Sequence, residues 1–367
     1  MTVRASVGMD RVLWLDECAG DRAPLVGGKA VGLGSLLREG LQVPPGFVVT
    51  TEAYRRFVRA RGLEREIDRA LEGATSPDAQ AEASRRLRSL FEGADPDDGL
   101  AREIRLAYDR LGPGEPVAVR SSATAEDTAE ASFAGQQDTY LWIRGAEAVV
   151  RSVVRCWGSL FTPQAIAYRA RFGIPAAEVA MGVVIQRMVA AEAAGVMLTL
   201  DPLTGDRSQI TIEASFGLGL AVVGGEVTPD RYAVDKVTFE LRSREIAPKP
   251  IAYRFDPGAG EVRACEVPPD EQQLPALSDP EVTAVASLGK RVERALGAPQ
   301  DIEWAVGPGP GGPREVFLLQ TRPETVWSRR EVRPLSSPEE PILSRMLKAM
   351  SVPMRLDGGP PNLGDRG

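Results

Sequence analysis

The sequence predicts an α+β fold, because helical and strand-like segments are segregated along the chain. Residues 63–112 are rich in Ala, Arg and Glu at helical spacing, with breaks at Ser76-Pro77 and Asp95-Pro96, so we expect two or three amphipathic helices there. From residue 181 onward, short β-branched runs separated by glycine and proline predict a sheet. The length of 367 residues is enough for two or three structural units.

The other elements of the first part follow from turn and cap residues. The segment GGKAVGLGSLLREG predicts a glycine turn that leads into a short helix ending at Gly40. The segment VPPGFVVTTEAYRRFV predicts a turn, a short strand and a helix capped by Thr50 or Thr51. Residues 147–172 predict two further helices with a break near Thr162-Pro163.

The second part is expected to contain a sheet and one long helix. The runs MGVVIQRMV, AAGVMLTLD, SQITIEAS and RYAVDKVTFEL read as strands, and residues 279–296 as a helix. DIEWAV and EVFLLQTR, separated by GPGPGGPR, predict a hairpin with a long loop. The tail is rich in Pro, Gly and charge, with one short helix at most, at 341–350. We therefore expect an N-terminal subdomain at 1–180, a C-terminal subdomain at 181–328 and a tail or linker at 329–367.

The composition excludes several classes of function. The net charge of −7 disfavours nucleic acid or an anionic membrane as a partner, and no run approaches the roughly 18 apolar residues of a membrane span. The three cysteines form neither a metal spacing nor a disulfide framework, which predicts a cytoplasmic protein. The chain has no histidine, so a Ser-His-Asp triad, a histidine-ligated metal and a phosphohistidine on this chain are excluded.

Two stretches carry residues suited to binding phosphate. In VGGKAVGLGSL, glycines precede Lys29 at a helix start, where backbone N–H groups and an ammonium suit an anion, although a purely structural turn also fits. In AVRSSATAEDTAEASFAGQQDTYLWI, a buried strand over Val117–Val119 is expected to deliver Arg120 at its end, where the guanidinium can fork two phosphate oxygens. The residues that follow carry hydroxyl and amide side chains. Gly135 and the amide of Gln136 can approach the same anion. A polar surface loop with one Arg–carboxylate pair is the alternative.

Two more stretches complete a candidate site. In VVIQRMV, strand alternation points Gln186 and Met188 the same way, and an apolar methionine beside backbone polar groups suits an adenine ring, although a core strand with an exposed glutamine fits as well. In the hairpin, Glu303 and Gln320 can share one face, with Arg322 on the same side as Gln320. Two oxygen ligands on a rigid sheet suit Mg²⁺, which takes its remaining ligands from water and phosphates. A solvated sheet face is the alternative.

Five stretches in this order resemble the ATP-binding domain of the phosphoenolpyruvate synthase, pyruvate phosphate dikinase and rifampin phosphotransferase family. The resemblance covers about residues 8–328 and rests on GGKAVGLGSLLREGLQVPPGFVVT, VRSSATAED…ASFAGQQDTYL, VVIQRMV…GVMLTLDPLTGD, ASFGLGLAVVGGEVTPDRY and DIEW…LLQTRPETV. It implies an ATP-grasp-like fold that holds ATP between two subdomains.

The resemblance also implies roles for individual residues. Lys29, Arg120 and Arg322 would act on the phosphates as the catalytic residues, and Glu303 and Gln320 would hold Mg²⁺. The residues expected to contact the nucleotide and its metal are Lys29, Arg120, Gly135, Gln136, Thr139, Ile185, Gln186, Met188, Glu213, Glu303, Gln320 and Arg322. Leu220 departs from the pattern, because many relatives have a glutamate there; Glu213 or Glu226 would have to supply the missing carboxylate.

Relatives pass the β-phosphoryl group of ATP to a histidine on a mobile domain, which leaves AMP and phosphate. This chain has no histidine, and its length and its LQTRPETVWS stretch resemble the separate ATP-binding subunit of phenylphosphate synthase. The implied function is the ATP-binding subunit of a split dikinase-type phosphotransferase, whose histidine-bearing partner phosphorylates a small molecule such as a phenol or pyruvate. One alternative is a nucleotide-sensing regulatory subunit, which Leu220 supports. The other is an excised ATP-binding domain of a longer phosphoenolpyruvate synthase or rifampin phosphotransferase.

Overall fold

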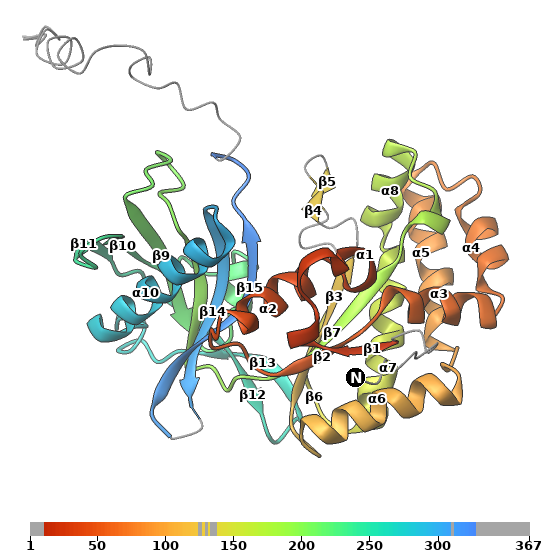
Figure 1. Cartoon of the computed structure of the whole chain (residues 1–367), viewed down its shortest axis with the longest axis horizontal. Helices are drawn as coiled ribbons and strands as arrows, with labels where there is room; N and C mark the ends of the chain where they lie inside the picture. The colour runs from red at the N-terminus through yellow and green to blue at the C-terminus, as the bar shows by residue number, and fades with distance from the viewer. Residues whose placement is uncertain (1–10, 124–126, 129–130, 133–137, 310–311, 328–367) are drawn as a thin grey trace, which may run out of the picture. The chain divides into compact units, whose positions relative to one another are not determined.

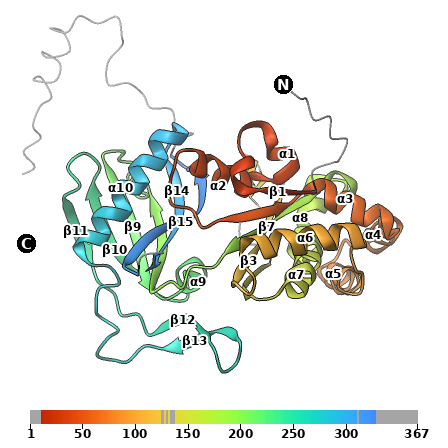
Figure 2. The same cartoon turned by 60° about the horizontal axis from the view of Figure 1, so that its bottom comes forward.

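The computed structural model confirms the α+β class (Figures 1 and 2). It describes residues 11–123, 127–128, 131–132, 138–309 and 312–327. Within these residues, two antiparallel sheets are each covered by helices. The predicted tail helix at 341–350 lies outside the described residues.

The first sheet has the strand order β1-β2-β7-β3-β6, with neighbouring strands antiparallel. Its strands are β1 (Val12–Trp14), β2 (Gly46–Val49), β3 (Val117–Ala123), β6 (Thr139–Ile143) and β7 (Met181–Arg187). The predicted subdomain boundary after residue 180 is misplaced with respect to this sheet, because β7 lies between β2 and β3. A buried β-branched run does not reveal which sheet it will join.

Helices pack on one face of the first sheet and bury a single apolar core (Figure 1). They are α3 (Thr51–Ala60), α4 (Leu63–Leu71), α5 (Pro77–Glu92), α6 (Asp98–Leu111), α7 (Ala146–Gly158) and α8 (Pro163–Phe172). Thr50 caps α3 as predicted, since its hydroxyl accepts a hydrogen bond from Ala53 N at 3.4 Å. Phe57 and Trp157, with ring centroids 5.0 Å apart, lie at the centre of this core.

The second sheet has the strand order β11-β10-β9-β8-β14-β15. Its strands are β8 (Ala193–Leu198), β9 (Gln209–Phe216), β10 (Asp230–Asp235), β11 (Leu241–Glu245), β14 (Gln300–Pro308) and β15 (Arg314–Pro323). Helix α10 (Asp279–Leu296) has the predicted bounds and shares an apolar core with this sheet. The capping box formed by Ser278 and Glu281 fixes its start, and Gly297 in the left-handed conformation ends it.

Helix α2 (Gly28–Arg38) connects the two sheets, although along the chain it lies between β1 and β2 of the first sheet. Its residues Leu33 and Leu36 belong to the same core as Trp304 of the second sheet and Val48 and Val184 of the first. Helix α2 therefore lies between the sheets, where its N-terminal turn can reach residues from both (Figure 2).

The remaining elements are short. They are η1 (Leu15–Glu17), η2 (Gly20–Arg22), α1 (Ala23–Val26), β4 (Asp127–Thr128), β5 (Ala131–Ser132), η3 (Ser159–Phe161), η4 (Ala176–Glu178), α9 (Leu220–Val223), β12 (Ile251–Asp256) and β13 (Glu261–Glu266). Strands β12 and β13 form a two-stranded antiparallel ribbon. In the described part of the chain, no helix has both the length and the apolar character needed to cross a membrane.

Candidate functional site

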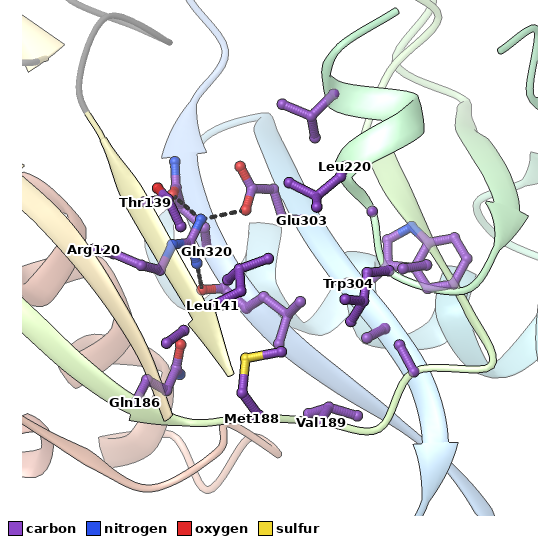
Figure 3. Close-up of a pocket in the computed structure, with 18 of the residues that line it drawn as sticks. Arg120, Thr139, Leu141, Gln186, Met188, Val189, Leu220, Glu303, Trp304 and Gln320 are labelled. Carbon is purple, nitrogen blue, oxygen red and sulfur yellow. Dashed lines mark hydrogen bonds and ion pairs between the residues drawn. The ribbon is translucent and has the colours of Figure 1, made fainter. Parts of the chain in front are cut away.

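A cavity of about 430 Å³ lies between the two sheets (Figure 3). One wall comes from β3, β6 and the end of β7, and the other from β8, β14, β15 and the segment around α9. Of the predicted site residues, those that line the cavity are Lys29, Arg120, Thr139, Gln186, Met188, Glu303, Gln320 and Arg322. Residues predicted from four separate stretches of the sequence therefore meet at one place.

Arg120 lies in the middle of strand β3 rather than at its end. It pairs with Val184 of β7 on one side and with Thr139 of β6 on the other. The prediction of a strand end at Arg120 was wrong, because β3 continues to Ala123, which pairs with Met181. Ser121 and Ser122 resemble a loop in sequence, but they are buried within the sheet.

The guanidinium of Arg120 connects the two sheets. Its Nη2 donates hydrogen bonds to Glu303 Oε2 at 2.6 Å and to Gln320 Oε1 at 2.8 Å, and its Nη1 donates to Leu319 O at 2.9 Å. Glu303 pairs with Gln320 and Trp304 pairs with Leu318, so Leu319 is an extra residue at a bulge in β15. The bulge leaves the Leu319 carbonyl available to Arg120. Figure 3 shows this convergence at one end of the cavity.

Lys29 reaches the same cavity from the first turn of α2. Its Nζ donates to Ser121 O at 3.0 Å and to Ser121 Oγ at 3.3 Å. Ser122 is also occupied within the protein, because its Oγ accepts a hydrogen bond from Ala30 N at 3.2 Å. The two serines therefore position α2, whereas the sequence suggested that their hydroxyls face an anion.

Gly27 permits a close approach of backbone to backbone. It has φ +80°, and a Cβ at this position would lie 2.0 Å from Ser122 O. We expected this glycine to make room for a ligand, but in the structure it makes room for β3. The close contact lets the first turn of α2 hold Lys29 against Ser121.

Glu303 and Gln320 fit the role of metal ligands. Their side-chain oxygens already surround one cationic group, Nη2 of Arg120. A carboxylate and an amide oxygen on directly opposed residues form an oxygen donor set of the kind that Mg²⁺ prefers, with the other ligands left to water and phosphate.

Arg322 is held at the edge of the cavity by Asp301, which the sequence analysis did not single out. The two residues are paired across β14 and β15, and Arg322 Nε donates to Asp301 Oδ2 at 2.8 Å. The side chain of Arg322 is 44% exposed, so its contact with Asp301 is open to solvent and exchangeable. Asp301 stands two residues before Glu303 in DIEW, on the same face of β14, a spacing that could have identified it.

The other end of the cavity is apolar (Figure 3). Met188 contributes to it as expected, and Leu141, Val189, Leu220 and Trp304 were not predicted as pocket residues. Trp304 is fully buried, and its Nε1 has no hydrogen-bond partner among the described residues. Apolar residues of this kind give no sequence signal, because the same pattern is typical of a core strand.

Gln186 and Met188 both line the cavity, but so do Arg187 and Val189, so the predicted alternation does not extend past the end of β7. Gln186 is 2% exposed, and its Nε2 donates to Pro44 O at 3.2 Å. The backbone N–H of Met188 donates to Pro116 O at 2.9 Å. These two donors are therefore engaged with the protein, which leaves the Gln186 amide oxygen and the Met188 side chain as the groups suited to face a ligand.

Some predicted residues lie elsewhere. Ile185 is fully buried in the core beneath the helices, because alternation along β7 points it away from Gln186. Glu213 lies on β9, 4.0 Å from Arg231, and does not line the cavity. Glu226 accepts a hydrogen bond from Tyr253 Oη at 2.9 Å and does not line it either. The predicted contacts Gly135 and Gln136 fall outside the described residues.

Comparisons with known proteins identify the family of the chain. Residues 23–341 match the family model described as pyruvate phosphate dikinase, AMP/ATP-binding domain. The chain is 42% identical over 360 residues to a phosphoenolpyruvate synthase of Aeropyrum pernix, covering 90% of this chain and 44% of the relative. It is 42% identical over 346 residues to a probable phosphoenolpyruvate synthase of Methanocaldococcus jannaschii, covering 92% and 28%.

A third relative, a phosphoenolpyruvate synthase of Pyrococcus furiosus, is 38% identical over 358 residues, covering 86% of this chain and 44% of the relative. The chain thus spans less than half the length of these relatives. The family match covers every strand of the two sheets except β1, and every predicted site residue that lines the cavity. With its ATP-grasp-like α+β fold, the chain belongs to the family of pyruvate phosphate dikinase AMP/ATP-binding domains.

Proposed function

We propose that the cavity binds ATP together with Mg²⁺ and that the chain is the ATP-binding component of a dikinase-type phosphotransferase. The observation that carries this proposal is the convergence of Arg120, Glu303 and Gln320 at one end of the cavity, with Lys29 on its wall. Cationic groups and oxygen ligands suit a phosphate chain, whereas the apolar end suits a purine ring.

The residues that line the cavity have different roles in phosphoryl transfer. Lys29 and Arg120 bind phosphate oxygens, and Arg322, oriented by Asp301, steadies the transferring group. Glu303 and Gln320 hold Mg²⁺, which neutralises charge on the phosphate oxygens when it is bound. Phosphate oxygens replace the present acceptors of Arg120, so the guanidinium stays paired in either state.

The phosphoryl acceptor lies outside these 367 residues, because they contain no histidine. We infer that the β-phosphoryl group passes to a histidine on a separate partner chain, leaving AMP and phosphate. The partner then phosphorylates a small molecule such as a phenol or pyruvate. The resemblance to the ATP-binding subunit of phenylphosphate synthase supports this arrangement.

A nucleotide-sensing role without transfer is the second candidate. The observation that favours it is Leu220, whose apolar side chain lines the cavity where many relatives carry a glutamate. The presence of Lys29, Arg120 and Arg322 on the same cavity favours transfer instead.

Calorimetry with Mg·ATP and Mg·GTP tests the site. We expect ATP to bind more tightly, because the apolar end of the cavity and Gln186 are suited to adenine. No binding of ATP, or equal affinity for GTP, would contradict the proposed site.

Incubation with ATP labelled at the β-phosphate tests the transfer. The isolated chain should neither retain label nor produce AMP above slow background hydrolysis. After addition of a polypeptide that carries the family's phosphoacceptor histidine, we expect label on that polypeptide and AMP in solution. Stoichiometric labelling of the isolated chain would overturn the split-enzyme proposal, and ATP binding without any transfer would favour the sensing role.

A further inference from the structure

A bulge in β6 sends two adjacent side chains to different places. Leu141 and Trp142 together stand opposite the single residue Ala118 of β3, because Val117 pairs with Ile143 and Val119 with Tyr140. Trp142 has φ +60°, a left-handed conformation that a bulky residue rarely adopts. Leu141 lines the cavity, whereas Trp142 packs outside it. Bulges beside binding sites commonly redirect side chains in this way.

Trp142 stacks on a residue that belongs to the ribbon β12–β13. Its ring lies 4.7 Å from that of Phe255 with an interplanar angle of 12°, and the Arg144 guanidinium lies 5.5 Å from the centre of the Phe255 ring. The Trp142 Nε1 is buried without a hydrogen-bond partner among the described residues. The strained backbone and the unpaired indole N–H each raise the free energy of this arrangement. The stack of Trp142 on Phe255 is therefore kept despite an unfavourable local free energy.

The same ribbon supports the opposite wall of the cavity. Leu218, which lines the cavity, donates its backbone N–H to Tyr253 O at 2.9 Å. The hydroxyl of Tyr253 donates to Glu226, just after α9, at 2.9 Å. Tyr253 and Phe255 are two residues apart on β12, so their side chains lie on one face of the ribbon. One face of β12 therefore holds both the α9 wall and Trp142.

We propose that Trp142 and Phe255 are positioning residues for the nucleotide. Their stack connects Leu141 on the first sheet to Leu218, which follows β9 of the second sheet, through β12, and so fixes the separation of the two walls that face the bound ligand. Neither residue lines the cavity, so both act through the leucines beside it. The inference rests on the proposed function, namely that this cavity binds ATP.

The substitution Phe255→Ala tests the proposal by calorimetry with Mg·ATP. Loss of the stack should weaken ATP binding about two- to tenfold, the range expected for an aromatic pair. Phe255→Tyr keeps the stack and should restore the affinity. Phe172→Ala is the matched control, because Phe172 also belongs to an aromatic pair, with Tyr168 at 4.5 Å, but both rings lie on the single helix α8, so this pair does not join two elements.

Hydrogen exchange on the unsubstituted chain gives a second measurement. It should not change on ligand binding if Trp142 and Phe255 have a purely structural role. Binding of Mg·ATP should slow exchange at 140–143 and at 252–256 together, although these segments belong to different sheets. The proposal is overturned if Phe255→Ala binds ATP as tightly as the unsubstituted chain, if Phe172→Ala weakens binding equally, or if only one of the two segments gains protection. Failure of the unsubstituted chain to bind ATP would instead overturn the proposed function, and this inference with it.

Discussion

Glu303 and Gln320 stand directly opposite each other on β14 and β15, and their side-chain oxygens accept hydrogen bonds from the same nitrogen of Arg120. The antiparallel register fixes this relationship. The predicted long loop at GPGPGGPR is shorter than expected, because the strands stay paired as far as Pro308 and Arg314. The pair belongs to one sheet and Arg120 to the other. A ligand that replaced these partners would therefore act on both sheets.

Arg120→Lys should reduce transfer about a hundredfold or more, because a lysine keeps the charge but loses the fork that can bind two phosphate oxygens. AMP formation in the presence of the histidine-bearing partner measures this effect, and circular dichroism checks that the variant is folded. Arg105→Lys is the control, since Arg105 pairs with Glu147 on the surface at 2.6 Å. A folded Arg120→Lys variant with full activity would show that the guanidinium does not serve the phosphates.

Gly27→Ala should lower stability by about 1–3 kcal/mol, because the new Cβ would collide with the backbone of β3. It should also weaken ATP binding, since the first turn of α2 carries Lys29. Thermal unfolding and calorimetry measure the two effects. Gly40→Ala is the matched control: Gly40 has φ +64° but open space around it, so only the conformational cost of about 1 kcal/mol remains. Equal effects of the two substitutions would contradict the role assigned to the Gly27–Ser122 contact.

Lys249→Met should lower the free energy of unfolding by about 3–5 kcal/mol, because it leaves the Asp230 carboxylate buried without its cation. Both side chains are fully buried, and Asp230 also accepts backbone N–H groups from Ala247 at 3.1 Å and Ala276 at 2.8 Å. Denaturant unfolding measures the loss. The exposed pair Glu82–Arg85 is the control, and Glu82→Gln should leave the unfolding midpoint unchanged. A Lys249→Met variant as stable as the parent would mean that the backbone N–H groups and the Tyr232 hydroxyl satisfy the carboxylate without a cation.

Cys18 should resist alkylation in the native protein, since burial raises the pKa of its thiol to about 12. Its Sγ donates to Trp14 O at 3.1 Å. Because the folded pKa exceeds the ordinary value of 9.0, the folded state keeps this proton at a pH where the unfolded state loses it. The stability that this thiol contributes therefore falls as pH rises from 9.0 towards 12.

A thiol reagent at about pH 8 should modify Cys265, which is partly exposed, and reach Cys18 only after denaturation. Modification of Cys18 in the folded Cys265→Ser variant would contradict its burial.

Local signals in the sequence predicted those parts of the fold that depend on local physics. Helix α10 was predicted with its observed bounds because Ser278, Glu281 and Gly297 mark its ends within the segment itself. The opposition of Glu303 and Gln320 followed from a hairpin, which is also local.

Predictions failed where distant segments decide the outcome. Residues Arg120–Ser122 have the composition of a loop, but they form a strand because they pair with β7. Helix α2 also donates hydrogen bonds to Ser121 and Ser122 from more than ninety residues away in sequence. The placement of Glu213 outside the cavity likewise follows from pairing within the second sheet, which no local pattern specifies. The apolar end of the cavity escaped prediction because Leu141 and Trp304 have the composition of core residues.

The position of β7 has a consequence for how the chain acquires its structure during synthesis. Strands β1 and β2 emerge early, but β2 has no partner towards β3 until β7 pairs with both. A ribosome that has released only residues 1–180 therefore exposes two unpaired sheet edges on either side of the missing strand. Contacts of such long sequence separation slow folding and invite aggregation. A truncated chain that ends before Met181 would lack the strand between β2 and β3. A chain that retains residues up to Arg187 has every strand of the first sheet.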